Sequence, residues 1–406
     1  MKIFYFHAVL LLAAGLLVGV ALAATAQESR WIELTERAES LLRQGKYSEG
    51  IAPATEALRV AEGTFGAQNV NVARSLNNLG ELYRAEGKYG EAEPYYLRSL
   101  AMLERLAPGH IELAAGLNNL GLLYHAEGKY SDEESVYKRA LAIEERTLAP
   151  GDPRIAATLN NLAMLYRVQG RYTEAEPLYT RSIAIREKTF GPDDLDLAAT
   201  LNNLAELYRS QGRYADAEPL CKRSLAIREK SLAPDHVDVA QSLNTLGIIY
   251  FEQKKYEEAE PLLKRSLSIR EKALGPEHPD VGQSLNALAG LYSTLGKYQD
   301  AEPLYRRSLA IREAKLGPDH LDVARTLNNL AALYAKEGKY GEADPLYKRS
   351  LAIREKVLGP ESLEVASSLE NYSVVLRQLK REPEALEFES RAKAIRAKHP
   401  QEASSK

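Results

Sequence analysis

The sequence predicts an all-α solenoid of about nine helix pairs, and three observations lead to that fold class. The motif Leu-Asn-Asn-Leu, or a close relative of it, recurs at one step of 41 residues and otherwise at steps of 42. A Gly-Lys-Tyr or Gly-Arg-Tyr turn follows nearly every copy, and apolar residues recur at helical spacing within each unit. A fixed period of this size is typical of stacked repeats that contact only their neighbours. The motif begins at Leu76, Leu117, Leu159, Leu201, Leu243, Leu285 and Leu327.

The unit spanning residues 327–359 shows how each element is predicted. Leu327, Leu330, Ala331 and Tyr334 fall on one face of a first helix. Gly338 should end this helix, because glycine readily adopts the left-handed conformation that closes helices. Pro345 is expected early in a second helix, where a missing N–H costs little, and Gly359 follows its end. That second helix carries Ala343, Tyr347, Ser350, Leu351 and Arg354, and its apolar and small positions again fall at helical spacing.

The turns give the number of units. Eight of them, and a degraded one at Lys380, predict nine helix pairs, with degenerate units over residues 31–63 and 363–398. The eight turns begin at Gly45, Gly87, Gly128, Gly170, Gly212, Lys254, Gly296 and Gly338.

The repeated residues resemble the tetratricopeptide repeat (TPR). The long second helix, such as Asp-Pro-Leu-Tyr-Lys-Arg-Ser-Leu-Ala-Ile-Arg-Glu-Lys at residues 344–356, is similar to the kinesin-light-chain subclass. The resemblance covers Trp31 to Lys398. It implies a right-handed superhelical α-solenoid whose concave groove binds protein segments. No N-terminal heptad pattern like that of the motor-associated members is found, so motor binding is not expected.

Residues 1–26 predict an export signal. Lys2 precedes a stretch from Ile3 to Gln27 without a charged residue, and small residues typical of a cleavage site end it. We expect cleavage after Ala26, a solenoid over residues 27–398 and a flexible tail over 399–406. The alternative is an uncleaved anchor, since about 20 apolar residues suffice to span a bilayer. In either case the repeats should be periplasmic, or secreted if cleaved, in a bacterium.

Composition and motifs argue against several function classes. A net charge of -3 on 406 residues gives no electrostatic reason to expect nucleic acid or an anionic membrane as a partner. Membrane contact is expected only through an uncleaved N-terminal segment. The sequence has no Gly-rich phosphate loop, metal-binding histidine pair or nucleophile elbow. We therefore predict no enzyme, no cofactor, no metal site and no small-molecule substrate.

Several other polar or reactive residues have structural interpretations. Cys221 replaces a tyrosine of neighbouring repeats and should be a small core residue rather than a reactive thiol. The run from Arg228 to Lys230 should be a solvated face with local ion pairs. Three histidines recur at the repeat period, each followed two residues later by aspartate, and should start helices rather than bind metal. These pairs are His236 and Asp238, His278 and Asp280, and His320 and Asp322.

Two rows of asparagines are the most informative polar residues. At 100° per residue, the Asn78 row points away from the packed face of the first helix, and the Asn77 row lies at its edge. Asparagine inside a helix costs up to about 0.7 kcal/mol relative to alanine, so its repetition needs a reason. The Asn78 row either bonds the backbone of the adjacent helix or offers amides to the backbone of an extended peptide, as in the resembled family. The row contains Asn78, Asn119, Asn161, Asn203, Asn329 and, in the last unit, Asn371.

The Asn77 row is expected to be structural. It contains Asn77, Asn118, Asn160, Asn202, Asn244, Asn286 and Asn328.

The remaining positions of that face vary along the chain, as a recognition surface should. Apolar side chains there would be anchor points for a partner: Leu122, Met164, Ile248 and Phe251. Basic ones would give its N-terminal half positive charge: Arg84, Arg167 and Arg209. Alternatively these residues pack against neighbouring helices, and Arg84 and Arg209 pair with Glu81 and Glu206.

We predict a non-catalytic scaffold that binds an extended protein or peptide segment in its groove. The alternative is a structural, self-associating component of a cell-envelope assembly.

Overall fold

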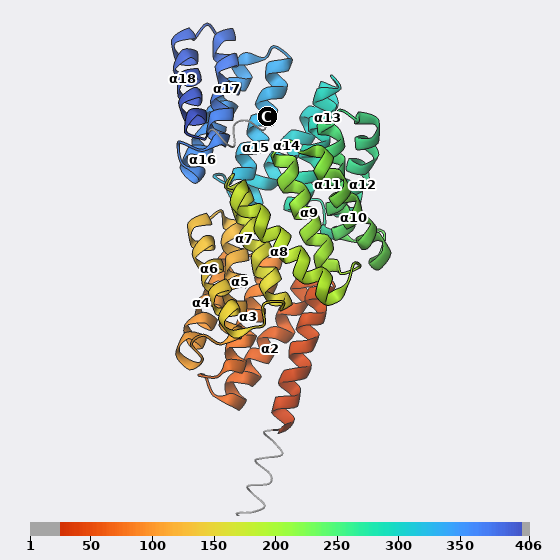
Figure 1. Cartoon of the computed structure of the whole chain (residues 1–406), viewed down its shortest axis with the longest axis vertical. Helices are drawn as coiled ribbons and strands as arrows, with labels where there is room; N and C mark the ends of the chain where they lie inside the picture. Colours follow the sequence, from red (N-terminus) through yellow and green to blue (C-terminus); the bar gives the residue numbers. More distant parts are fainter. Residues whose placement is uncertain (1–24, 400–406) are drawn as a thin grey trace, which may run out of the picture. The chain divides into compact units, whose positions relative to one another are not determined.

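The computed structural model describes residues 25–399, which form eighteen helices and no strand (Figure 1). The first helix covers residues 25–43 of the described chain. The others are α2 (Tyr47–Phe65), α3 (Val70–Ala85), α4 (Tyr89–Leu106), α5 (Ile111–Glu127), α6 (Tyr130–Thr147), α7 (Pro153–Val168), α8 (Tyr172–Phe190), α9 (Leu195–Ser210), α10 (Tyr214–Ser231), α11 (Val237–Glu252), α12 (Tyr256–Leu274), α13 (Pro279–Thr294), α14 (Tyr298–Leu316), α15 (Leu321–Lys336), α16 (Tyr340–Leu358), α17 (Leu363–Gln378) and α18 (Glu382–Lys398).

The helices pack as nine consecutive pairs within the described residues, which confirms the predicted repeat. In each pair we call the first helix A and the second helix B. The chain divides into two compact units, residues 1–148 and residues 149–406. Unit 1 contains the described helices up to α6, and unit 2 contains α7 to α18. Within each unit, every helix packs mainly on the helices before and after it in the sequence.

Small residues allow the two helices of a pair to approach closely. A Cβ atom added to Gly80 of α3 would lie 2.8 Å from the ring of Tyr96 of α4. Ser99 of α4 also donates a hydrogen bond of 2.7 Å to the backbone carbonyl of Ala73. The same serine bond recurs in unit 2, for example from Ser224 to Ala198. The small residues and serines of the repeat therefore hold its A and B helices together.

A buried arginine joins each helix B to the next helix A in much of unit 2. Arg270 of α12 is only 3% exposed. Its Nη1 donates to the backbone carbonyl of Asp280 at 2.9 Å, to Oγ of Ser284 at 2.9 Å and to Oε1 of Gln283 at 3.0 Å. Burial lowers the pKa of Arg270. Equivalent bonds to the next helix A are made by Arg228, Arg312 and Arg354.

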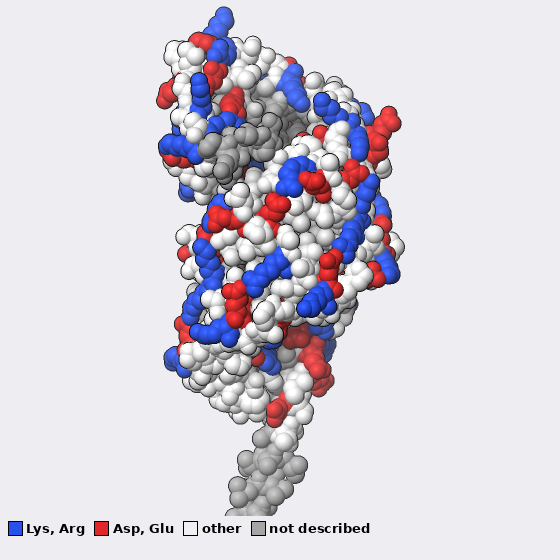
Figure 2. All heavy atoms as spheres, in the orientation of Figure 1, with Lys and Arg blue, Asp and Glu red and all other residues white. Residues whose placement is uncertain are grey.

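The prediction of a solvated face at Arg228, Glu229 and Lys230 is therefore wrong for Arg228, which is 2% exposed. Glu229 and Lys230 are exposed, but their ion pairs join neighbouring repeats rather than residues of one helix. Glu229 accepts from Arg265 at 2.8 Å, and Lys230 pairs with Asp193. On the face that Figure 2 shows, basic and acidic side chains are intermixed. Exposed pairs of this kind contribute about 0–1 kcal/mol each.

The turns between A and B helices confirm that the predicted glycine ends helix A in a left-handed conformation. Gly338 has φ 78°, in the left-handed region that favours glycine. Lys254 and Lys380 occupy the same place with φ 63° and 60°. Pro345 differs from expectation, because it lies past the first turn of α16 and removes one backbone hydrogen bond. Its would-be acceptor belongs to exposed Gly341, whose carbonyl can bond water.

The predicted helix starts and core thiol are also confirmed. Nδ1 of His236 accepts the backbone N–H of Asp238 at 3.2 Å, and His278 and His320 cap their helices in the same way. Cys221 is fully buried, and burial raises the pKa of its thiol. Between residues 25 and 399, no helix is both long and apolar enough to cross a bilayer. Most of the predicted export signal, residues 1–24, and the tail from 400 onward lie outside the described residues.

Candidate functional site

The A helices form the inner side of the stack within each unit. Successive A helices contact one another, from α3 to α5 in unit 1 and along α7, α9, α11, α13, α15 and α17 in unit 2. In the described part of the chain, successive B helices make no contact of comparable extent. A stack whose A helices lie closer together curves toward them. The face of each A helix that is turned away from helix B is therefore the candidate binding surface, which we call the inner face.

Most of the Asn78 row lies half-buried on this inner face, whereas Asn371 is exposed, and four of its amides bond a neighbouring A helix. Nδ2 of Asn203 on α9 donates to Oδ1 of Asn160 on α7 at 3.0 Å. Asn329 bonds Asn286 in the same way at 3.3 Å. In unit 1, Asn119 bonds Asn77 at 3.3 Å, and Asn78 bonds Glu39 at 3.3 Å.

The sequence left two roles open for these amides, and a bond to the adjacent helix is observed. That bond reaches a side chain rather than the backbone, and each uses one of the two amide N–H groups. The Asn77 row supplies the acceptor in three of these four bonds, in agreement with its predicted structural role. Asn161 accepts from Asn160 of its own helix at 3.3 Å.

The apolar candidates are half-buried rather than fully exposed. In unit 2, Ile248 and Phe251 of α11 pack at the edge of a core cluster that includes Leu288 and Leu291. The ring of Phe251 lies 6.0 Å from that of Tyr256. Met164 of α7 is also half-buried. Leu122 holds the equivalent position on α5 of unit 1 and has the same degree of exposure.

The basic candidates have different surroundings. Arg209 pairs with Glu206 at 3.0 Å, as the sequence allowed. Burial raises the pKa of Glu206, but the guanidinium groups of Arg209 and Arg167 outweigh this effect and hold it below its usual value. Arg167 itself forms no ion pair within 4 Å among the described residues. Arg84 in unit 1 likewise forms no bond with Glu81 in the described part of the chain, so that predicted pair is not found.

A pair between a buried carboxylate and a half-buried histidine in unit 1 was missed by the sequence reasoning. Glu133 of α6 is fully buried, and Nδ1 of His125 on α5 lies 3.0 Å from its Oε1 and 3.2 Å from its Oε2. Burial raises the pKa of Glu133, partly opposed by the hydrogen bond to His125. The available signal was internal comparison, because the equivalent residue is Gly50 in α2 and alanine in the other B helices: Ala92, Ala175, Ala217, Ala259, Ala301, Ala343 and Ala385.

The structure distributes the candidate residues over both units. Unit 1 holds Asn78, Arg84, Asn119 and Leu122, and unit 2 holds Asn161, Met164, Arg167, Asn203, Arg209, Ile248, Phe251 and Asn329. Within residues 25–399, no three His, Cys, Asp or Glu side chains are grouped so that they could hold a metal ion. The inner face combines amides, aliphatic and aromatic side chains, and guanidinium groups. This combination suits recognition of a polypeptide.

Comparisons with known proteins agree with this architecture. Two family models described as tetratricopeptide repeat match the chain. One matches residues 30–105, 154–230, 196–272, 238–314, 300–356 and 322–398, and the other matches residues 113–154. No match was found among curated proteins.

Solved structures resemble the chain in fold. A Rap protein complexed with competence and sporulation factor has a TM-score of 0.69 and 16% identity, covering 94% of this chain and 100% of its own. Aspartyl phosphate phosphatase F from Bacillus subtilis has a TM-score of 0.53 and 13% identity, covering 91% and 94%. A putative kinesin light chain from Podosopora anserina with nearly identical TPR-like repeats has 27% identity and a TM-score of 0.40, covering 50% and 97%.

Proposed function

The chain belongs to the tetratricopeptide-repeat family, and we propose that it is a non-catalytic scaffold that binds an extended segment of another protein on its inner face. One observation carries the proposal. The packed positions of the A helices repeat almost unchanged, whereas the half-buried inner positions change from Met164 and Arg167 on α7 to Ile248 and Phe251 on α11. Packing alone gives no reason for that variation, but selection of one partner sequence does.

The inner face offers the groups that such binding needs. A half-buried apolar side chain such as Phe251 can gain further burial from a partner at little loss of its own rotamer freedom. Arg167, without an ion pair in the described structure, can bond a carboxylate or a backbone carbonyl. The amides that connect the A helices keep an N–H group for a ligand. The solved Rap protein, similar in fold, is itself complexed with a factor, which supports the use of this fold for binding.

The test is capture of partners from an extract of the cells that make the protein. We expect the double variant Arg167→Ala, Phe251→Ala to bind the captured partner at least tenfold more weakly, because about 1.4 kcal/mol or more of contact energy is removed. Affinity is then measured by titration with the purified partner. The asparagines are left intact, since replacing Asn203 would also remove a bond between A helices.

The matched control changes one cation and one aromatic residue of the B helix α8, outside the inner face, Lys188→Ala and Phe190→Ala. Both side chains are exposed. This control should bind like the wild type, and circular dichroism melts should show that both variants are folded. Equal binding by the inner-face variant and the wild type would contradict the proposal.

We also propose that the protein is exported and that its repeats act outside the cytoplasm. The uncharged, apolar stretch from Ile3 to Gln27 supports this proposal. The intact mass of the protein isolated from its own cells should correspond to a chain that begins at Gln27, or at Ala24 if the earlier small-residue site is used. A mass that retains Met1 in the membrane fraction would favour the anchor, and a full-length cytosolic protein would contradict export.

A further inference from the structure

The segment that α4 forms with the loop after it is one residue shorter than its counterparts, because it covers residues 89–110, whereas α10 and its loop cover residues 214–236. The loop between α4 and α5 consists of Ala107 to His110, whereas the loop between α10 and α11 runs from Leu232 to His236. This missing residue accounts for the single 41-residue step of the sequence. Gly109 adopts φ 81° in the short loop, a conformation that other side chains rarely adopt. Gly109 also stands directly before the capping histidine, where Asp235 stands in the longer loop.

At four junctions of unit 2, the residue in that place is a carboxylate that binds a lysine of the next helix B. The lysine lies near the end of its helix, and the pair spans two neighbouring repeats. Lys272 and Asp235 are 2.7 Å apart. The other three pairs are Lys230 with Asp193, Lys356 with Asp319 and Lys398 with Glu361.

In unit 1 the corresponding cation is Arg146, and its loop has no carboxylate in this place. Arg146 of α6 faces Gly109, and a Cβ atom on that glycine would collide with its guanidinium group. In the part of the chain that the structure describes, the Arg146 side chain has no ion pair or hydrogen bond. By contrast, Arg105 one repeat earlier donates to Oε1 of Gln68, which holds the same place in the loop between α2 and α3.

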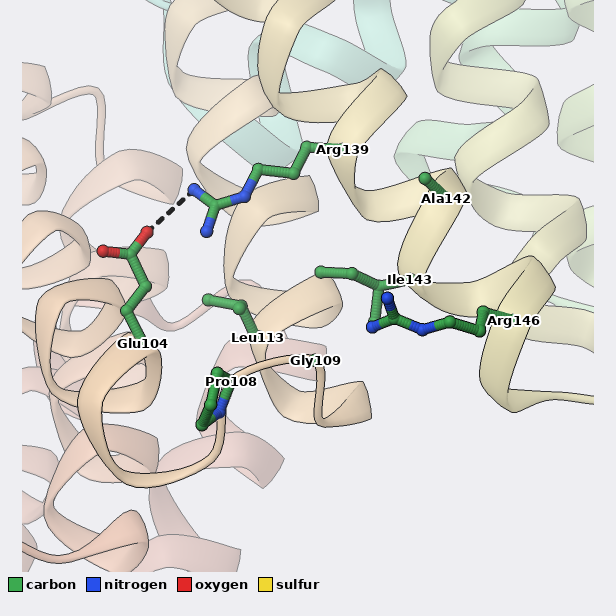
Figure 3. A pocket seen from close by; sticks show the side chains of 8 residues that line it. All are labelled: Glu104, Pro108, Gly109, Leu113, Arg139, Ala142, Ile143 and Arg146. Atoms are coloured by element: carbon green, nitrogen blue, oxygen red, sulfur yellow. Dashed lines mark hydrogen bonds and ion pairs between the residues drawn. The ribbon is translucent and has the colours of Figure 1, made fainter.

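A pocket of about 520 Å³ lies beside this cation (Figure 3). Arg139 and Arg146 of α6 line it together with Glu104 of α4, and Arg139 is held by Glu104 at 2.7 Å. Leu113, Ala142 and Ile143 provide an apolar wall, and Pro108 and Gly109 form the loop side. With two guanidinium groups and one carboxylate, these lining residues carry a net charge of +1.

We propose that this pocket binds the aspartate-bearing loop of a partner polypeptide, whose carboxylate pairs with Arg146. The chain itself gives the precedent, because a loop aspartate fills the same place at three junctions of unit 2 and a glutamate at a fourth. A guanidinium group binds a carboxylate through two parallel hydrogen bonds, which makes Arg146 a better receptor than the lysines of those junctions. The apolar wall takes the residues next to the aspartate. The site involves two B helices, a loop and the buried Leu113 at the start of α5, and it is separate from the candidate residues of the inner face.

The test uses a blocked peptide with the sequence of residues 316–320, acetyl-Leu-Gly-Pro-Asp-His-amide, which contains one carboxylate. Saturation-transfer NMR on the full-length protein should show binding with a dissociation constant on the order of 1 mM. The Asn version of the peptide should bind at least tenfold more weakly. Arg146→Met should weaken binding of the Asp peptide by a similar factor, because the side chain keeps its length and loses its charge.

Two further variants make the test specific. Arg105→Met removes a guanidinium group that Gln68 already bonds, and should leave binding unchanged. Replacing Ala107–His110 by the five residues of Leu232–His236 restores a carboxylate in the chain itself and should abolish binding of the peptide while the helical melt is retained. The inner-face variant Arg167→Ala, Phe251→Ala should bind the peptide normally, so failure of either proposal can be recognised separately.

Three results would overturn the inference. One is equal binding of the Asp and Asn peptides, and another is unchanged binding by a folded Arg146→Met protein. The third is displacement of the peptide by acetate at the same concentration, since a free small carboxylate would then be as good a ligand as a polypeptide loop.

Discussion

Replacement of Arg270 by methionine should lower the free energy of unfolding by about 2–4 kcal/mol, among the largest effects expected of one substitution in unit 2. Methionine fills much of the volume but cannot donate hydrogen bonds. The backbone carbonyl of Asp280 and the hydroxyl of Ser284 are then left in a buried interface with one partner fewer, and each such loss costs about 1–3 kcal/mol. Urea unfolding followed by circular dichroism measures the change.

Arg265→Met on the same helix is the matched control. Arg265 is exposed and pairs with Glu229 at 2.8 Å, so its loss should cost no more than about 1 kcal/mol. Because each repeat is stabilised by its neighbours, the Arg270 variant should also weaken the junction between α12 and α13 selectively. Hydrogen exchange should therefore become faster near that junction than in α7. Equal destabilisation by the two variants would show that the buried arginine does not hold neighbouring repeats together.

Glu133→Gln should make the protein more stable than the wild type at pH 8, by about 1–3 kcal/mol, and by progressively less as the pH falls. Glu133 is fully buried, and an ionised carboxylate there is costly even beside His125. Glutamine keeps the volume and removes the charge. Glu104→Gln, at an exposed carboxylate, is the control and should be close to neutral.

The sign of the pH dependence follows from the raised pKa of Glu133. The unfolded chain titrates near the ordinary value of 4.5, and the folded chain holds its proton to a higher pH. The stability that protonated Glu133 contributes is fully present below pH 4.5 and is lost as the pH rises through the folded pKa. Urea unfolding of wild type and variant at pH 4, 6 and 8 should thus show a growing difference. A difference that is constant or that grows toward acid would contradict this account.

The sequence by itself determined the repeat architecture of this protein. The period, the helical spacing of residues such as Leu327 and Tyr334, and the turn at Gly338 each report local structure or contact with an adjacent unit. A single sequence is enough to recognise these features, because the same pattern recurs in every repeat. The helix-starting role of His236 and the buried position of Cys221 followed from the same internal comparison.

Only the tertiary structure decided which partners the polar side chains bond. Arg228 and Lys230 look alike in the sequence, yet one is buried against α11 and the other is in solvent. The asparagine amides could serve a ligand or a neighbouring helix, and only the spacing of A helices showed that Asn203 reaches Asn160. Arg146 has no loop carboxylate beside it, and only the structure shows that Gly109 holds the place beside Arg146 that Asp235 holds beside Lys272. Helical periodicity specifies which face a residue occupies, whereas a long side chain's partner depends on distances between helices that no local pattern contains.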